Sequence, residues 1–219
     1  MAQRSRSSSA QVALQWWPLL QGQAAAAPWP LLVVVHGHGG GAVPAVLQSL
    51  LDELAQARGA AVWVQALTAE PVELPPRQKL LLVPLLLTPG SHVRVDVPGI
   101  RQRLRELGHK VMCLPFLGAW QPWLQHLRQL GCEAECQVVV HHPLRPGIAD
   151  RYLHVLSQVI GLPLRSADSC DAGLDRVLPL ALAPNRMTAH LGAQQGGGLA
   201  LLEHPATREF LLELLLDLP

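Results

Sequence analysis

Short apolar runs alternate with amphipathic stretches along the first half of the chain. Residues 31–35, "LLVVV", form an uninterrupted β-branched run, which is typical of a strand covered on both faces of a parallel sheet. After the glycines that follow, apolar residues recur at helical spacing from Val43 to Leu54, and Gly59 stands where a helix C-cap is expected. The pattern predicts a strand, a glycine-rich turn and a helix.

The same alternation continues to about residue 130. Residues 60–67, 79–87 and 110–115 are predicted strands, and 97–107 and 120–130 are predicted helices. Strands separated by helices indicate right-handed crossovers and a mainly parallel sheet with helices on both faces. Pro84 interrupts the third strand, and because proline donates no hydrogen bond to a ladder, we expect a bulge there.

The second half of the sequence repeats the first. "QVVVHHPLRPG" resembles "LLVVVHGHGGG", and "VLPLALAPNRM" resembles "LVPLLLTPGSH", with Pro84 matching Pro179 and Pro89 matching Pro184. The fold class predicted is α/β, with two similar lobes, each a small parallel sheet flanked by helices, related by a pseudo-twofold with a cleft between them. The predicted division is a loosely docked leader over 1–28, a lobe over 29–130 that carries the site, and a degenerate repeat over 131–219.

The two copies differ where chemistry is expected. His36 matches His141, but His92 matches Met187, so at most one site with paired histidines is expected, in the first lobe. The later copy is shorter after its third strand, and we expect residues 188–198 to have lost a helix.

Composition narrows the classes of function. With 219 residues, 49% of them hydrophobic, the chain can bury a substantial core. Lys and Arg number 17 against 16 Asp and Glu, so the basic footprint of a nucleic-acid binder is missing. No apolar stretch reaches the roughly 20 residues that span a bilayer. The four cysteines form no paired framework, which favours free thiols in a reducing cytoplasm.

Two histidines lie at the expected carboxyl edge of the first sheet. His36 ends the first strand and His92 follows the third. In doubly wound sheets, ligands gather beyond the carboxyl ends of the strands, commonly between the first and third. Two imidazoles there suit Co²⁺, Fe²⁺ or Ni²⁺, and an unperturbed imidazole, with a pKa of about 6.5, also accepts protons near neutrality. A structural, hydrogen-bonded role for His36 is the alternative.

Two other enzyme classes have weaker support. "HGHGGG" resembles the oxyanion loop of esterases, but the chain has no G-x-S-x-G nucleophile elbow, and Ser91 lacks that frame. A dinucleotide site is not supported either, because no G-x-G-x-x-G is followed by an acidic residue at the end of the second strand.

The stretch "VPLLLTPGSHVRVDVPGI" resembles the signature of the sirohydrochlorin cobaltochelatase and ferrochelatase family, the class II chelatases that insert metals without ATP. In that signature, a strand with proline is followed by Gly-x-His, Val, two variable positions, Asp, an aliphatic residue and Pro. "VVVHG" resembles the family's other landmark, and the second half fits its longer members, in which two copies are fused.

The resemblance implies a lyase that inserts a divalent ion into sirohydrochlorin for cobalamin or siroheme synthesis. His36 and His92 would hold the metal, cobalt, iron or nickel, and take the pyrrole protons; we expect His92 to be the chief base, although the two roles can be exchanged. No cofactor beyond the substrate metal is implied. The expected partners are the tetrapyrrole and the ion, without nucleic acid or membrane, in a cytoplasmic protein for which a monomer suffices.

Departures from the signature leave alternatives open. The family commonly carries Ser after His-Gly and an acid just before the Asp, where this chain has His38 and Val95. His38 is either a third ligand or a solvent-facing side chain. Asp96 either orients His92 or caps the following helix. The missing acid keeps a second hypothesis open, a metal or tetrapyrrole carrier that does not catalyse insertion; an esterase is the third.

Overall fold

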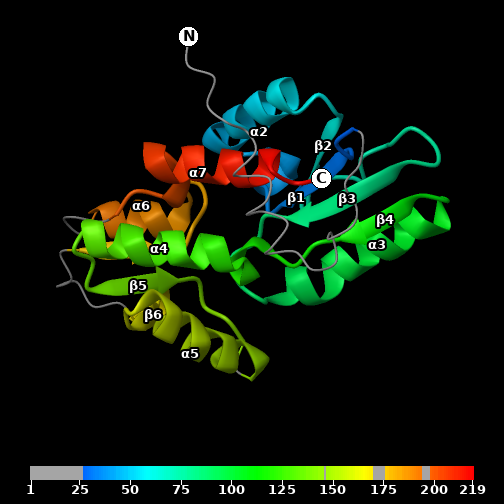
Figure 1. Cartoon of the computed structure of the whole chain (residues 1–219). Coiled ribbons are helices and arrows are strands. Elements are labelled where there is room, and N and C mark those ends of the chain that lie inside the picture. The colour runs from blue at the N-terminus through cyan, green and yellow to red at the C-terminus, as the bar shows by residue number, and fades with distance from the viewer. Residues whose placement is uncertain (1–26, 146, 170–175, 194–197) are drawn as a thin grey trace, which may run out of the picture.

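The computed structural model describes residues 27–145, 147–169, 176–193 and 198–219 (Figure 1). Nearly all of the predicted leader, residues 1–28, lies outside this part of the chain, as does Cys170. The described chain forms two parallel β-sheets flanked by helices, which confirms the predicted α/β class.

The first sheet has four parallel strands in the order β2-β1-β3-β4. Its strands are β1 (Leu31–Val35), β2 (Val62–Ala66), β3 (Lys79–Pro84) and β4 (Lys110–Cys113). The crossover helices are α2 (Ala45–Arg58) and α3 (Val97–Glu106), and Gly59 ends α2 in the left-handed conformation, at φ 71°, as predicted.

Strand β1 is buried along its whole length, as its β-branched run predicts. Alternate residues point to opposite faces, so Leu31 and Val33 join the core beneath α2, whereas Leu32 and Val34 pack with the residues of α3. The two neighbours of β1 in the sheet are β2 and β3, which places the reversal of strand order between β1 and β3.

The bulge expected at Pro84 is not present, because β3 ends at this residue. Pro84 still pairs in register with Val34 of β1. The amides of Leu81 and Leu85 donate toward β1, so the nitrogen of Pro84 faces the side of β4. Strand β4 ends at Cys113, which pairs with Leu82, so no residue of β4 lies opposite Pro84. The amide hydrogen that Pro84 lacks would therefore have had no ladder partner.

The second sheet has three parallel strands in the order β6-β5-β7, which repeats β2-β1-β3. Its strands are β5 (Val138–His141), β6 (Leu164–Ser166) and β7 (Val177–Pro179), and its helices are α5 (Ile148–Ile160) and α6 (Arg186–Ala193). The internal repeat seen in the sequence is therefore a repeat of topology. The exact limits of the two lobes stay a prediction.

The expected loss of a helix after the third strand of the repeat is wrong. Helix α6 occupies the place that α3 has in the first half, and within the described residues it is the fourth strand that has no counterpart. An irregular segment replaces it, and the amides of Leu201 and Leu202 donate to Ala181 and Leu182. Gly198 lies so close to Val177 that a Cβ would be 2.3 Å from the carbonyl oxygen of Val177. A glycine is needed for this approach.

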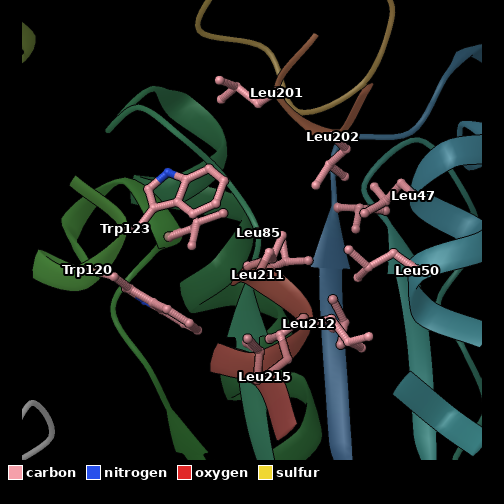
Figure 2. Close-up of a cluster of buried hydrophobic side chains, with 14 of the residues drawn as sticks. Leu47, Leu50, Leu85, Trp120, Trp123, Leu201, Leu202, Leu211, Leu212 and Leu215 are labelled. Carbon is pink, nitrogen blue, oxygen red and sulfur yellow. The ribbon is translucent and has the colours of Figure 1, made fainter. Parts of the chain in front are cut away.

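Two further helices, α4 (Gln121–Glu133) and α7 (Pro205–Leu216), join the sheets into one core. Figure 2 shows leucines of α7 between leucines of α2 and the buried tryptophans Trp120 and Trp123. The same cluster includes Val139 and Leu178 of the second sheet. Short 3-10 turns complete the connections: η2 (Gly39–Gly41), η4 (Leu117–Ala119), η5 (Ala167–Ser169) and η6 (Leu201–Glu203).

Arg58, at the end of α2, is a buried cation that fastens α7 to the first sheet. Its guanidinium donates to the backbone carbonyls of Trp29, Leu215, Leu218 and Pro219 at distances of 2.6–3.2 Å. Burial lowers the pKa of Arg58 to about 10, which still leaves the side chain charged at neutral pH. The positive charge therefore satisfies carbonyls at the end of α7 that have no partner within the helix.

Candidate metal centre

The first imidazole, His36, leaves the end of β1 on an exposed turn. Gly37 has φ 74°, and a Cβ there would be 2.6 Å from Oγ1 of Thr68, which itself donates to the carbonyl of His38. The backbone after β1 is therefore held against the residues that follow β2. His36 Nδ1 lies 2.8 Å from the carbonyl oxygen of Gly37. A carbonyl only accepts, so Nδ1 carries the hydrogen and Nε2 keeps a free lone pair.

The second imidazole lies on a π-helical turn, His92–Asp96, that runs directly into α3. Its hallmark is the hydrogen bond from the amide of Val97 to the carbonyl of His92, five residues earlier. Pro98 explains the wider turn, because it has no amide hydrogen to continue the α-helical ladder at that point. The predicted start of the helix near Asp96 is therefore preceded by one more turn.

Asp96 orients His92 and does not cap α3. His92 Nδ1 and Asp96 Oδ2 are 2.5 Å apart, and both side chains are partly exposed. Asp96 has right-handed helical backbone angles and makes no side-chain capping bond. Of the two roles left open by the sequence, the structure has the orienting one. The carboxylate accepts from Nδ1, and Nε2 of His92 is left free, as in His36.

The two imidazoles meet. The ring centroids of His36 and His92 are 4.8 Å apart, with an angle of 85° between the ring planes. They come from the chain segments that follow β1 and β3, which are neighbours in the sheet. The edge between these strands is where the topological rule predicts a ligand site, so the predicted convergence of His36 and His92 is present in the structure.

Two imidazoles that each hold a hydrogen-bond acceptor at Nδ1 can offer Nε2 to a borderline divalent ion. The described residues contain no group of three or more His, Cys, Asp or Glu side chains placed to hold a metal ion. A centre built on His36 and His92 alone would leave most coordination positions to other molecules. Such a centre favours transfer of an ion over permanent retention.

His38 lies on the exposed turn after Gly37, and its side chain is exposed. Its backbone is engaged, since its amide donates to Ala42 and its carbonyl accepts from Gly41 and Thr68. This arrangement favours the solvent-facing role among the two that the sequence left open.

The second lobe contributes an imidazole that the sequence analysis missed. His142 Nε2 lies 3.2 Å from Nδ2 of Asn185, whose Oδ1 accepts from the first amides of α6. Burial lowers the pKa of His142, a positive charge on His36 or His141 lowers it further, and Asp168 opposes them. The sequence signal that could have pointed to His142 is the pair of consecutive histidines, His141 and His142, after the repeated strand.

The direct counterparts of the pair are buried in the second lobe. His141 is 6% exposed, and its Nδ1 is 2.7 Å from the carbonyl of His142. Met187 is 5% exposed and packs in the core formed by Val138 and Val140. As expected from the mismatch of His92 with Met187, no second pair forms at this place.

Among the described residues, no helix combines enough length with enough apolar character to cross a membrane.

Comparison with solved structures identifies the fold. The chain is similar to the sirohydrochlorin chelatase SirB from Bacillus subtilis subspecies spizizenii, in complex with cobalt, at a TM-score of 0.52 and 16% identity, over 82% of this chain and 90% of that one. It is also similar to CbiX, the terminal enzyme for siroheme biosynthesis in denitrifying bacteria, at a TM-score of 0.50 and 20% identity, over 84% and 96%. No family model and no curated protein sequence matches. The fold is that of the sirohydrochlorin chelatases.

Proposed function

We propose that this protein is a sirohydrochlorin chelatase that inserts a divalent metal, cobalt or iron, into the ring without ATP, for cobalamin or siroheme synthesis. The observation that carries the proposal is the contact between His36 and His92 at the edge between β1 and β3. The chelatase fold supports it, and the structure of SirB contains cobalt.

The reaction exchanges one divalent ion for two protons, because the metal replaces the two pyrrole N–H hydrogens of the free ring. In the proposed mechanism, the free Nε2 atoms of His36 and His92 displace water from the incoming ion and hold it over the ring. As the ring nitrogens take over the metal, one imidazole is released and accepts a pyrrole proton, and solvent removes the second. We assign the first proton to His92.

Asp96 suits His92 to this role. Its carboxylate lies 2.5 Å from Nδ1 and stabilises the positive charge that develops when Nε2 takes a proton. His36 has only a backbone carbonyl at its Nδ1, so its imidazolium would be stabilised less. This difference favours His92 as the base and His36 as the co-ligand.

The test is an insertion assay with the full chain, sirohydrochlorin and each of Co²⁺, Fe²⁺ and Ni²⁺, in which the absorption of the free ring is followed. We expect loss of that absorption at a rate well above the reaction without protein. His92→Ala should lower the rate by about 100-fold or more. His154→Ala, a control at an exposed position of α5, should leave it unchanged.

A carrier that binds metal or tetrapyrrole without catalysis is the second candidate. Val95 favours it, because the residue is 64% exposed beside Asp96 and supplies no carboxylate. Ring binding by the wild type with no acceleration of insertion for any of the three ions would establish the carrier and overturn the enzyme. An unchanged rate in His92→Ala would show that the reaction occurs elsewhere.

We also propose a cytoplasmic location. The three cysteines of the described chain, Cys113, Cys132 and Cys136, are free thiols, and Cys132 is exposed. Free, exposed thiols are typical of a reducing compartment.

A further inference from the structure

A cavity of about 370 Å³ lies beside the paired imidazoles, between α3 and the segment that follows β4. Its lining includes Val93, the residue after His92, Pro84, at the end of β3, and Phe116. The cavity therefore opens at the same carboxyl edge of the first sheet as the candidate metal centre. It does not contain His36 or His92.

Two arginines line this cavity. Arg101 and Arg105 are four residues apart on α3, so they project from one face of the helix. Both lower the pKa of the Cys113 thiol, another lining residue, although burial outweighs them and raises it. Arg101, Arg105 and Cys113 therefore line one and the same cavity.

Neither arginine has a carboxylate partner. None of the ion pairs found among the described residues involves Arg101 or Arg105. Glu106, the acid next to Arg105 in the sequence, instead accepts a hydrogen bond from the side-chain amide of Gln102. The Nε atom of Arg101 is buried and makes no hydrogen bond within the described chain.

This arrangement is unfavourable unless an anion is bound. Like charges one helical turn apart repel each other, and a buried donor without an acceptor loses its hydrogen bond to water. A carboxylate would satisfy both, because it accepts two hydrogen bonds from a guanidinium in a fork. Apart from Gln102 and Cys113, the remaining lining residues are apolar, among them Pro84, Val97 and Phe116, and they suit the methylene groups of an alkyl carboxylate.

We propose that this cavity binds one carboxylate side chain of the tetrapyrrole, with Arg101 and Arg105 as its anchors. The inference rests on the proposed function and adds a substrate subsite to it. Val93 links the cavity to the turn that carries His92, so a side chain bound there would fix the rotation of the ring over the metal centre. The site would select rings rich in carboxylates.

The first experiment measures ring binding without metal insertion. The probe is metal-free uroporphyrin, which carries eight carboxylates, and its fluorescence is titrated with the full chain. We expect Arg101→Gln combined with Arg105→Gln to weaken binding by about tenfold or more. The matched control is Arg128→Gln combined with Arg151→Gln, which removes the same charge from exposed positions on α4 and α5 and should change the affinity by less than about threefold.

A second variant protects the test against misfolding. Arg105 is exposed, so Arg105→Glu should fold normally, and its reversed charge should weaken uroporphyrin binding more than Arg105→Gln does. Binding by the double variant and by Arg105→Glu that equals the wild type would overturn the subsite.

The second experiment separates the subsite from the proposed function. In the insertion assay, we expect the variant that combines Arg101→Gln with Arg105→Gln to raise KM for sirohydrochlorin by about tenfold with little change in kcat. A lysine in place of the glutamine at position 101 should recover part of the lost affinity, because it restores the charge but not the guanidinium fork. If the wild type inserts no metal but its uroporphyrin binding depends on Arg101 and Arg105, the chelatase proposal fails and the anion site stands. A fall in kcat with KM unchanged would overturn an anchoring role.

Discussion

The two sheets share a strand order but present different chemistry at their carboxyl edges. At the first edge, His36 is exposed and meets His92, which Asp96 orients. At the second, the residue matching His36 is the buried His141, and the residue matching His92 is Met187, a core residue. The comparison teaches that the repeated strand order alone does not make a site. A polar residue on the turn after the third strand is also required.

The first test of this comparison replaces the matched histidines, His36 and His141, one at a time. We expect His36→Ala to lower the insertion rate by about 100-fold or more, because the variant lacks a proposed ligand of the metal. His141→Ala should leave the rate within about threefold, because its ring is buried against the backbone. Equal losses would show that both sheets take part in the reaction. Thermal melts of both variants check the fold.

The second test concerns how the end of the chain is fastened to the first sheet. Arg58→Met removes the guanidinium that donates to the carbonyls of Trp29, Leu215, Leu218 and Pro219, and of these only Pro219 keeps a backbone donor within the described chain, the amide of Trp29. We expect the free energy of unfolding, measured in urea, to fall by about 3–5 kcal/mol. Arg58→Lys should retain only part of the stability, since an ammonium cannot reach all four carbonyls in the same fork. A loss below about 1 kcal/mol would contradict the clamp.

The third test removes the orienting carboxylate of the first site. Asp96→Asn keeps the size of the side chain but loses its negative charge beside His92. We expect kcat/KM for insertion to fall by about tenfold while the melting temperature changes little. Asn185→Ala, which removes the side-chain amide next to His142, is a comparison variant in the second lobe and should affect insertion less. A larger loss of insertion in Asn185→Ala than in Asp96→Asn would indicate that the reaction takes place near the second sheet.

The smallest expected effect is a pH dependence of the core shared by both sheets. Burial lowers the pKa of His126, whose Nε2 pairs with Thr207 Oγ1 and whose ring stacks on Phe210. The folded state therefore binds its proton less readily than the unfolded chain, whose value is near 6.5. Stability from this group is complete above that value and falls as the pH drops through it toward the folded pKa.

The measurement compares urea unfolding of the wild type and His126→Gln at about pH 7.5 and about pH 5.5. We expect the wild type to lose more stability on acidification than the variant does. A steeper loss in the variant would contradict the assigned direction.

Much of the first lobe could be predicted because its signals are local. The β-branched run of β1, the helical spacing of α2 and the position of Gly59 each depend on neighbours in the chain. The meeting of His36 and His92 followed from a general rule of parallel sheets, which needs only the order of the strands.

The features that escaped prediction depend on contacts distant in the chain. In the second lobe, the segment that stands in place of a fourth strand brings Gly198 close to Val177 of β7, a contact between distant residues that local patterns do not reveal. The buried role of Arg58 requires α7, more than 150 residues later. Arg101 and Arg105 have the spacing of an ordinary wet helix face, and only the packing of α3 over β4 reveals the cavity. The pseudo-twofold and the cleft stay predictions.

The π-helical turn makes the position of the His92 imidazole depend on Pro98, six residues further along the chain. A conventional helix turns by about 100° per residue, so restoring the regular spacing at Pro98 would swing His92 around the axis of α3 by roughly that angle. That rotation would carry the imidazole away from His36. A substitution at Pro98, which is not one of the two histidines, is therefore expected to separate the two rings.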